Sequence, residues 1–189
     1  MPRSIFAMEL CLRFDAGLPS ALVPMLQRES DRPSPNELWT LWTQAARHLL
    51  WRKNAWVSGC WDYWDETNKA VAMYPDWVGS LMKEDGARTA PSGSNDPYRG
   101  NGEAFMTLTM ACLLVHGTQS ERAMAATCEI PESRLWHSAS FERILQGIGN
   151  INFAVVDRAT LYLIPRDDGW ALTPDDLRNP KFGYLRPIL

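Results

Sequence analysis

The chain has 189 residues, of which 46% are hydrophobic and 22% charged, and its formal net charge is -3. This composition supplies enough apolar side chains for a folded core and excludes a disordered chain. The slight excess of acid also excludes a protein that attracts nucleic acid over its whole surface, so any such contact has to be local.

The cysteines and the apolar stretches bear on compartment and cofactors. The four cysteines show neither a CxxC pair nor any other metal-type spacing, so no metal and no other cofactor is expected. Charged residues interrupt the apolar start of the chain before it reaches the length of a secretory signal, and residues 104–115 are too few to cross a bilayer. These features predict a cytoplasmic protein without a membrane partner.

Three segments near the start of the chain carry local signals of secondary structure. Residues 4–14 alternate loosely and predict a strand, and residues 18–28 predict a short helix. Ser34, followed by Pro35 and Glu37, has the spacing of a capping box, which predicts the start of a longer helix. The apolar positions of this helix recur at helical spacing and predict a core face, made of Leu38, Trp42, Ala45 and Leu49.

Seven of the nine tryptophans fall in the first half of the chain, which is more aromatic surface than a small core needs. Two interpretations follow. The rings bridge a helical bundle, since an indole carries a large apolar area and a single N–H. Alternatively, some of them line a ligand pocket or a partner interface, where tryptophan is enriched. We favour the first interpretation from the sequence.

An acidic cluster follows within this region. If residues 61–66 are helical, Trp61 and Trp64 share one side, and Asp62, Asp65 and Glu66 share another. Three carboxylates at this spacing could bind a hard cation or act as acid and base groups. The simpler interpretation is a solvated helix face, because no histidine and no glycine-rich loop lies near it.

Residues 86–102 are dominated by Gly, Pro, Ser and Asn, and they predict an exposed connection. Arg99 and the neighbouring amides could present an anion site at the start of the next element, and a plain linker is the alternative. Residues 103–116 are strongly apolar and end at Gly117, which predicts a buried helix.

The segment from residue 118 to residue 145 predicts two short helices joined by a turn. Thr118 and Glu121 have capping-box spacing, and Pro131 suits the first turn of the second helix. With Ala125 at the small interior position and Leu135 in the second helix, this segment resembles the helix-turn-helix of bacterial DNA-binding proteins. The alternative is a helical hairpin in a bundle core.

The end of the chain changes to strand-like patterns. Residues 151–156 and 160–164 predict a β-hairpin, residues 170–172 a third short strand, and residues 173–176 a capped helical turn. Helix, helical hairpin and β-hairpin occur in the same order in winged-helix domains, so the resemblance extends to topology. It implies nucleic-acid or partner contacts by exposed side chains of the second helix: Ser133, Arg134 and His137. The tail adds a small basic patch, which could contact nucleic acid or an acidic partner: Arg178, Lys181 and Arg186.

The sequence therefore predicts a predominantly helical α+β protein with a helical N-terminal lobe, a central helical hairpin and a small C-terminal β-hairpin. The expected divisions are residues 1–85, a linker at 86–102 and residues 103–189, with the two lobes also able to form one domain. We expect a non-catalytic binding or assembly subunit with a protein partner or a second copy, and nucleic acid as a further candidate. A ligand-binding protein or small enzyme using Asp62, Asp65 and Arg99 is the first alternative, and a structural homo-oligomer is the second.

Overall fold

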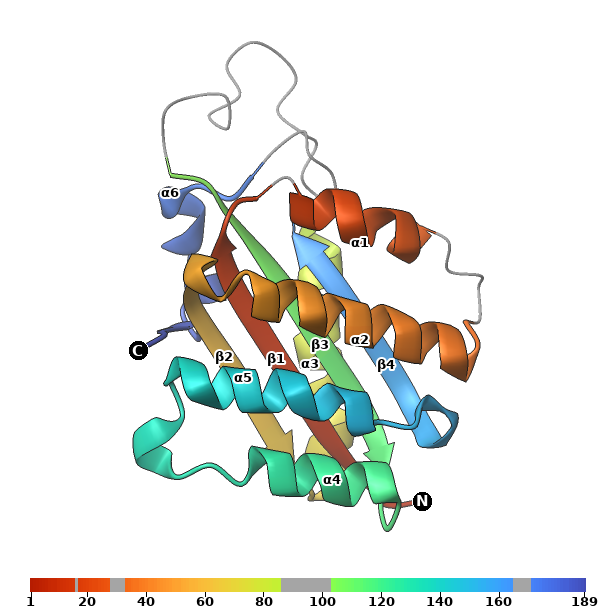
Figure 1. The fold of residues 1–189 in the computed structure, drawn as a ribbon. Helices are drawn as coiled ribbons and strands as arrows, with labels where there is room; N and C mark the ends of the chain where they lie inside the picture. Colours follow the sequence, from red (N-terminus) through yellow and green to blue (C-terminus); the bar gives the residue numbers. More distant parts are fainter. Residues whose placement is uncertain (16, 28–32, 86–102, 165–170) are drawn as a thin grey trace.

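The computed structural model describes residues 1–15, 17–27, 33–85, 103–164 and 171–189. A five-stranded antiparallel sheet with the order β4-β3-β1-β2-β5 forms the centre of the molecule, and helices cover both of its faces (Figure 1). The predicted architecture of a helical lobe with a small C-terminal hairpin is therefore wrong. The sheet uses strands from the start, the middle and the end of the chain.

The first strand, β1 (Arg3–Arg13), lies in the middle of the sheet and confirms the strand predicted near the N-terminus. It pairs with β2 (Trp56–Trp64) on one side and with β3 (Phe105–Val115) on the other. Residues 4–12 are all buried. Because successive side chains in a strand point to opposite faces, this burial means that both faces of β1 are covered.

β3 was predicted as a helix, and that prediction is wrong. The strand is buried along nearly its whole length because it has a paired strand on each side and helices over both faces. A strand buried on both faces loses its polar and apolar alternation, and its continuous apolar run is then indistinguishable from that of a buried helix.

The predicted helix at residues 61–66 is also wrong, because most of this segment belongs to β2. Trp61 and Asp62 therefore point to opposite faces of the sheet. The Trp61 side chain packs in the core beneath the larger helical layer, and its indole N–H donates to the carbonyl oxygen of Leu135 at 3.0 Å. Asp62 faces the other layer.

The predicted C-terminal β-hairpin is wrong as well. Residues 153–155 form a 3₁₀ turn, and a single strand, β4 (Val156–Ile164), follows and pairs with β3. The expected third strand is reduced to an isolated bridge between Leu172 and Phe105, and Trp170 lies outside the described residues. The last strand, β5 (Arg186–Pro187), pairs with Ser58 and Gly59 of β2.

The larger helical layer consists of α1 (Gly17–Gln27), α2 (Pro35–Trp51), α4 (Gln119–Cys128) and α5 (Ser138–Gly147) (Figure 1). The capping box predicted at the start of α2 is confirmed: Ser34 accepts the Glu37 amide, and the Glu37 carboxylate accepts the Ser34 amide. Trp42 is fully buried between this layer and the sheet, with its ring 5.2 Å from that of Phe153.

The opposite face of the sheet carries α3 (Thr67–Asp85), which runs behind the strands in Figure 1. Ala70 and Tyr74 of this helix pack against small and aliphatic side chains of β1 and β3. The chain later returns to this side with α6 (Pro174–Leu177), whose predicted cap at Thr173 is confirmed. Phe182 is buried against Cys11 and Leu172, which anchors the segment that leads into β5.

The resemblance to a helix-turn-helix does not survive in the structure. α4 begins after Thr118 as predicted, although Glu121 reaches the Gly117 amide rather than that of Thr118. The second helix does not begin at Pro131, because residues 132–134 form only a 3₁₀ turn and α5 starts at Ser138. Both helices pack on the sheet, so neither the expected second helix nor a winged-helix arrangement is present.

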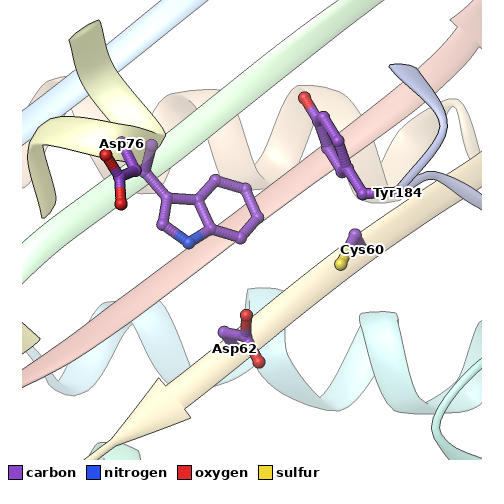
Figure 2. Close-up of a pocket in the computed structure, with 5 residues that line it drawn as sticks. Cys60, Asp62, Asp76 and Tyr184 are labelled. Atoms are coloured by element: carbon purple, nitrogen blue, oxygen red, sulfur yellow. The ribbon is translucent and has the colours of Figure 1, made fainter. Parts of the chain in front are cut away.

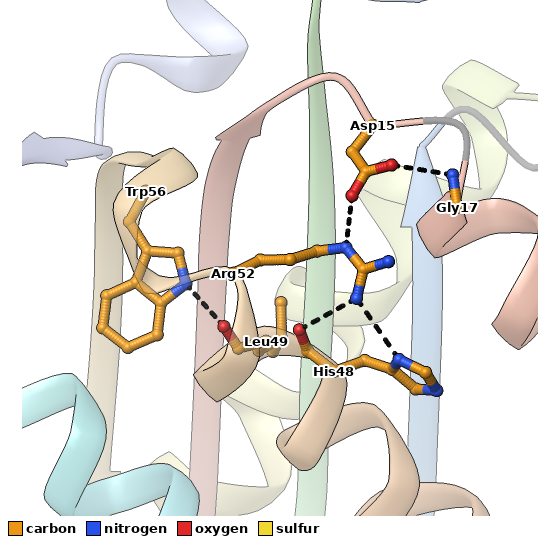
Figure 3. A network of polar contacts seen from close by, with 6 residues as sticks. All are labelled: Asp15, Gly17, His48, Leu49, Arg52 and Trp56. Carbon is orange, nitrogen blue, oxygen red and sulfur yellow. Dashed lines mark hydrogen bonds and ion pairs between the residues drawn. The ribbon is translucent and has the colours of Figure 1, made fainter.

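A polar network joins the end of α2 to the end of β1 (Figure 3). The Arg52 guanidinium donates to Asp15 at 2.6 Å, and the same carboxylate accepts the Gly17 amide at 2.8 Å. These contacts hold the pKa of Asp15 below its ordinary value, with the Gly17 amide as the largest cause. Arg52 also lies 3.3 Å from Nδ1 of His48, whose pKa is lowered by burial and by the guanidinium charge. The network fixes the connection between β1 and α1 to the end of α2.

Within the described part of the chain, no helix combines the length and the apolar character needed to cross a membrane.

Candidate functional site

A pocket with a volume of about 240 Å³ lies on the α3 side of the sheet. Its described lining comes from three separate parts of the chain (Figure 2): Cys60 and Asp62 from β2, Asp76 and Trp77 from α3, and Tyr184 from the segment before β5. The lining thus combines two carboxylates with two aromatic rings, and its described residues include no basic side chain.

Local structure explains how these groups meet. The alternation of β2 places Cys60 and Asp62 on the α3 face, while Trp61 between them points into the opposite core. The ring of Trp77 packs edge-on against that of Tyr184, with 5.9 Å between centroids and 69° between planes. This T-shaped arrangement is a favourable geometry for two aromatic rings and forms one wall of the pocket.

A buried glutamate lies behind this wall. Glu9, on β1, is directly opposite Cys60 in the sheet and has no exposed surface. The Tyr184 hydroxyl donates to Glu9 Oε2 at 2.5 Å, whereas Glu9 Oε1 has no hydrogen-bond partner among the described residues. The pKa of Glu9 is raised, because burial disfavours the charged form more than the nearby hydroxyls favour it. The buried carboxyl is therefore held more readily as the neutral acid than an exposed one.

Two threonines of β3 complete the surroundings of Glu9. Thr109 is opposite Glu9 in the sheet, and Thr107 lies two residues away on the same face. Their hydroxyls are close enough to lower the pKa of Glu9 in part, but neither forms a hydrogen bond of normal geometry in the described structure. The centre of this face is thus polar, between an apolar cluster around Tyr74 and another around Phe182.

Burial also changes the titration of the pocket groups. The pKa of Asp62 is raised by partial burial, against a smaller opposing effect from the Trp64 side chain. The pKa of the Cys60 thiol is raised to about 12, by burial and then by the charges of Asp62 and Glu9. A thiol with this pKa is protonated at neutral pH, and the thiolate is the nucleophilic form. The pocket therefore lacks an activated cysteine.

Further acidic residues follow the end of β2 or lie on α3. Asp65 and Glu66 follow the strand and are exposed, and Asp76 is exposed on α3. Lys69 pairs with Glu66 at 2.9 Å, and its ammonium group lies 5.0 Å from the centre of the Trp64 ring. This end of the face thus shows both an acidic character and an existing contact between a cation and an indole.

Among the described residues, the structure brings only one of those predicted for a ligand site into the pocket. Asp62 lines the pocket. Asp65 lies beyond the end of β2 and is exposed, so it does not share a helix face with Asp62 as expected. Arg99 lies outside the described residues.

The residues predicted for nucleic acid or a partner lie at the surface. Ser133, Arg134 and His137 are exposed in the connection between α4 and α5. Among the tail cations, Arg178 pairs with Asp175, the Lys181 ammonium lies 5.0 Å from the Phe182 ring centre, and Arg186 is exposed in β5. The C-terminus approaches the first group, since the Leu189 amide donates to Trp136 at 2.9 Å.

Sequence reasoning missed most of the pocket. Glu9 carried a usable signal, because it is the only acid inside an otherwise apolar strand, and a lone charge at an inward position suggests a site. Trp77 was noted only as one of many tryptophans. Tyr184 lies 175 residues from Glu9, and no local pattern indicates that the two side chains meet.

A second cavity of about 350 Å³ lies near the start of α2 and the end of α5. Trp39 lines it and donates to the Gly149 carbonyl oxygen at 3.2 Å. Its described lining contains asparagines and backbone but no charged side chain: Pro35, Asn36, Trp39, Gly149, Asn150, Ile151, Asn152 and Phe153. It therefore offers less basis for a specific ligand than the pocket beside Glu9.

Comparison of the chain with protein families, with curated proteins and with solved structures gives no match. Among the described residues, no group of three or more His, Cys, Asp or Glu side chains is arranged to hold a metal ion. The geometry of the pocket is therefore the basis for a functional proposal.

Proposed function

We propose that this protein is a non-catalytic binding protein whose α3-face pocket receives a positively charged organic group. The observation that carries the proposal is the composition of the wall: Asp62 and Asp76 together with the rings of Trp77 and Tyr184, and no basic side chain among the described lining residues. Carboxylates attract a cation, and the face of an indole ring attracts it further when water is excluded.

The size of the pocket favours a small group. Its volume of about 240 Å³ is below the roughly 300–1,000 Å³ typical of pockets for drug-sized ligands. An ammonium or guanidinium group on a short aliphatic stem matches both this volume and the apolar walls. A bulky or anionic ligand matches neither.

The electrostatics of Asp62 support a cation in particular. Partial burial raises the pKa of this carboxyl, which means that its charged form is poorly compensated in the unliganded protein. A cation bound beside it supplies the missing compensation and lowers the pKa of Asp62 again. Binding and ionisation of Asp62 are then linked, so affinity falls as the pH is lowered through the pKa of the free pocket.

A catalytic role has weaker support. The thiol of Cys60 is kept protonated by its surroundings, and the thiol of Cys11 has a pKa of about 12 for the same reason. Glu9 is screened from the pocket by Tyr184, to which it is hydrogen-bonded. These groups fit a binding wall better than a set of reacting residues.

The proposal is tested by titrating the protein with n-butylammonium and n-butylguanidinium and following tryptophan fluorescence, with the neutral n-pentanol as a matched ligand control. We expect saturable binding of the cations that weakens with added salt and at least a tenfold weaker response to the alcohol, a difference of about 1.4 kcal/mol.

Two variants assign the response to the pocket. Asp62→Asn should lose most of the cation binding, whereas Asp65→Asn, outside the pocket, should keep most of it. Equal binding of cation and alcohol, or full cation binding by Asp62→Asn, would show that the pocket is not a cation site.

A further inference from the structure

We propose that the cation is a lysine or arginine side chain of a partner protein, presented by an extended segment that adds as a strand to the outer edge of β2. This inference rests on the proposed cation pocket and names the partner of that same site. Strand addition is a recurring way to bind extended peptides, with backbone hydrogen bonds giving affinity and side-chain pockets giving specificity.

The outer edge of β2 is covered over only part of its length. β5 pairs with Ser58 and Gly59 alone, and no other strand of the described chain pairs with β2 on this side. Before β5, the chain does not continue the pairing with β2. Tyr184 instead lies over the α3 face, where its hydroxyl donates to Glu9. The edge from Cys60 to Trp64 is left without a strand partner among the described residues.

Backbone alternation identifies the groups available at this edge. Pro187 lies opposite Ser58 and has no amide hydrogen, so Ser58 is not a hydrogen-bonded position of the β2–β5 pair. Gly59 is, and its backbone N–H and C=O point outward, toward β5. By the same alternation, Trp61 and Tyr63 direct their backbone N–H and C=O groups outward. No backbone hydrogen bond of these two residues to another segment on this side is found in the described structure.

An added strand places its side chain at the pocket. A residue opposite Asp62 points to the same face of the sheet as Asp62, which is the face of α3. Its Cβ atom then lies about 4.5–5.5 Å from that of Asp62. A lysine or arginine at this position can reach the Asp62 carboxylate and the ring of Trp77 without any change of register.

The charges at this edge favour a basic segment. Asp62 lines the pocket, and Asp65 and Glu66 follow the end of β2, whereas Lys69, a described cation beside them, already pairs with Glu66. Arg186 lies near enough to Cys60 to lower the pKa of its thiol, so a second cation is disfavoured beside β5. Charge therefore sets the register as well as the partner, with the cation opposite Asp62.

The other edge of the sheet is a poorer candidate. β4 presents Asp157 and Arg158 as exposed neighbours of opposite sign, and Asp157 already pairs with Arg3 at 2.8 Å. Mixed charge along an edge is a common protection against strand addition.

The test uses three matched peptides. The first is the acetylated and amidated peptide Thr-Lys-Thr-Lys-Thr, whose two lysines share one face of an extended strand. In the second, the threonine amides are N-methylated, which removes the hydrogen bonds that they donate to Trp61 and Tyr63 and places methyl groups between the two backbones, but keeps the charge. The third replaces lysine with glutamate. Binding is measured by calorimetry, and amide exchange at Trp61 and Tyr63 is followed by NMR.

We expect the first peptide to bind at least tenfold more tightly than n-butylammonium and to slow exchange at the Trp61 and Tyr63 amides. The N-methylated peptide should bind no better than n-butylammonium, and the glutamate peptide should not bind. Asp62→Asn should weaken the first peptide at least tenfold, with Asp157→Asn on β4, at the opposite edge of the sheet, as the unaffected control.

Each contrary result has one meaning. If both lysine peptides bind like n-butylammonium and exchange is unchanged, the cation pocket stands and strand addition is wrong. If neither peptide nor n-butylammonium binds, both proposals are wrong. If the two amides are protected in a concentration-dependent way without peptide, a second copy of the chain occupies the edge, and a basic partner is ruled out as its occupant.

Discussion

Glu9 shows how a single residue can be determined by its surroundings more than by its type. It stands in the central strand, fully buried, with one carboxyl oxygen bound by Tyr184 and the other without a partner in the described chain. A charged form in this position lacks the compensation that buried charges normally require. The residue therefore costs stability whenever it ionises.

We predict that Glu9→Gln changes the pH dependence of folding. Burial raises the folded-state pKa of Glu9 above its ordinary value of 4.5, so its contribution is fully favourable below that value and is lost as the pH rises through the folded-state pKa. The wild-type free energy of unfolding should fall from pH 5 to pH 8 relative to that of Glu9→Gln. Urea unfolding at several pH values measures this difference, and each pKa unit corresponds to about 1.4 kcal/mol.

Glu37 provides the matched control, because its pKa is lowered by the capping box with Ser34. Its contribution is fully present above its ordinary value of 4.5 and is lost as the pH falls through the lower folded-state pKa. The wild type should therefore lose its advantage over Glu37→Gln below that value, and the two should follow parallel courses where Glu9 titrates. A Glu9→Gln protein whose stability follows the wild type at every pH would mean that Glu9 does not titrate in this range.

At the scale of elements, contact between β2 and α5 depends on a glycine. A Cβ atom at Gly59 would lie 2.7 Å from Phe141 Cε1 and 3.0 Å from Leu10 Cδ2. Phe141 is itself fully buried and packs edge-on against Trp56, with 6.4 Å between ring centroids, so it has little room to move. Gly59 is therefore required by packing, not by an unusual backbone angle.

We predict that Gly59→Ala lowers the free energy of unfolding by about 1–3 kcal/mol, the usual cost of overpacking a core. Gly149→Ala is the control, since nothing lies within 4 Å of a Cβ atom at that position. It should leave stability within about 0.5 kcal/mol of the wild type. Denaturant unfolding of both variants decides the matter, and equal stabilities would contradict the packing described for Phe141.

The elements also show what the sequence could predict. The starts of α2, α4 and α6 were predicted because a capping residue acts within its own turn, as Ser34, Thr118 and Thr173 do. β3 was predicted as a helix, and β4 was predicted only in part, as the second arm of a hairpin at residues 160–164, because the pairing of both strands depends on distant parts of the chain. β3 is covered on both faces, and β4 pairs with β3 rather than with the residues just before it.

The candidate site, too, was predicted only where the signal is local in the sequence. The sequence predicted Asp62 as a candidate site residue. It also predicted that Asp65 shares a helix face with Asp62, and that helix does not form. The pocket instead needs β2, α3 and the C-terminal segment at once. Only the tertiary structure brings Tyr184 to Glu9 and Trp77, because such contacts leave no periodic trace in the sequence.

At the scale of the whole molecule, the last two residues form hydrogen bonds to two distant parts of the chain, β2 and the start of α5. Ile188 donates its amide to Val57 at 3.1 Å, Leu189 donates to Trp136 at 2.9 Å, and the Leu189 carbonyl oxygen accepts the Ser138 amide at 2.8 Å. These bonds join β2 to the start of α5 across the edge of the sheet. The segment from residue 184 to residue 189 thus serves both the pocket wall and the helical layer.

We predict that removing residues 186–189 lowers the free energy of unfolding by roughly 2–4 kcal/mol, at about 1 kcal/mol for each lost hydrogen bond. For a chain of this size, a loss of 1 kcal/mol lowers Tm by about 2–4 °C. Calorimetric melting measures the change. The substitution Arg47→Ala, at an exposed position of α2, should leave Tm unaltered, and an equally unaltered Tm for the C-terminal deletion would refute the stabilising role of these hydrogen bonds.

The central place of β1 has a consequence for how the chain is made. β1 pairs with β2 on one side, but Arg3 pairs with Val115 on the other, so more than a hundred residues are made after β1 starts before its second neighbour, β3, is complete. At about 5–20 residues per second, that interval lasts several seconds or longer. Until then, one edge of a strand that is apolar on both faces stays without its partner. Yield in the cell should therefore depend on chaperones and on the rate of synthesis more than on the stability of the finished protein.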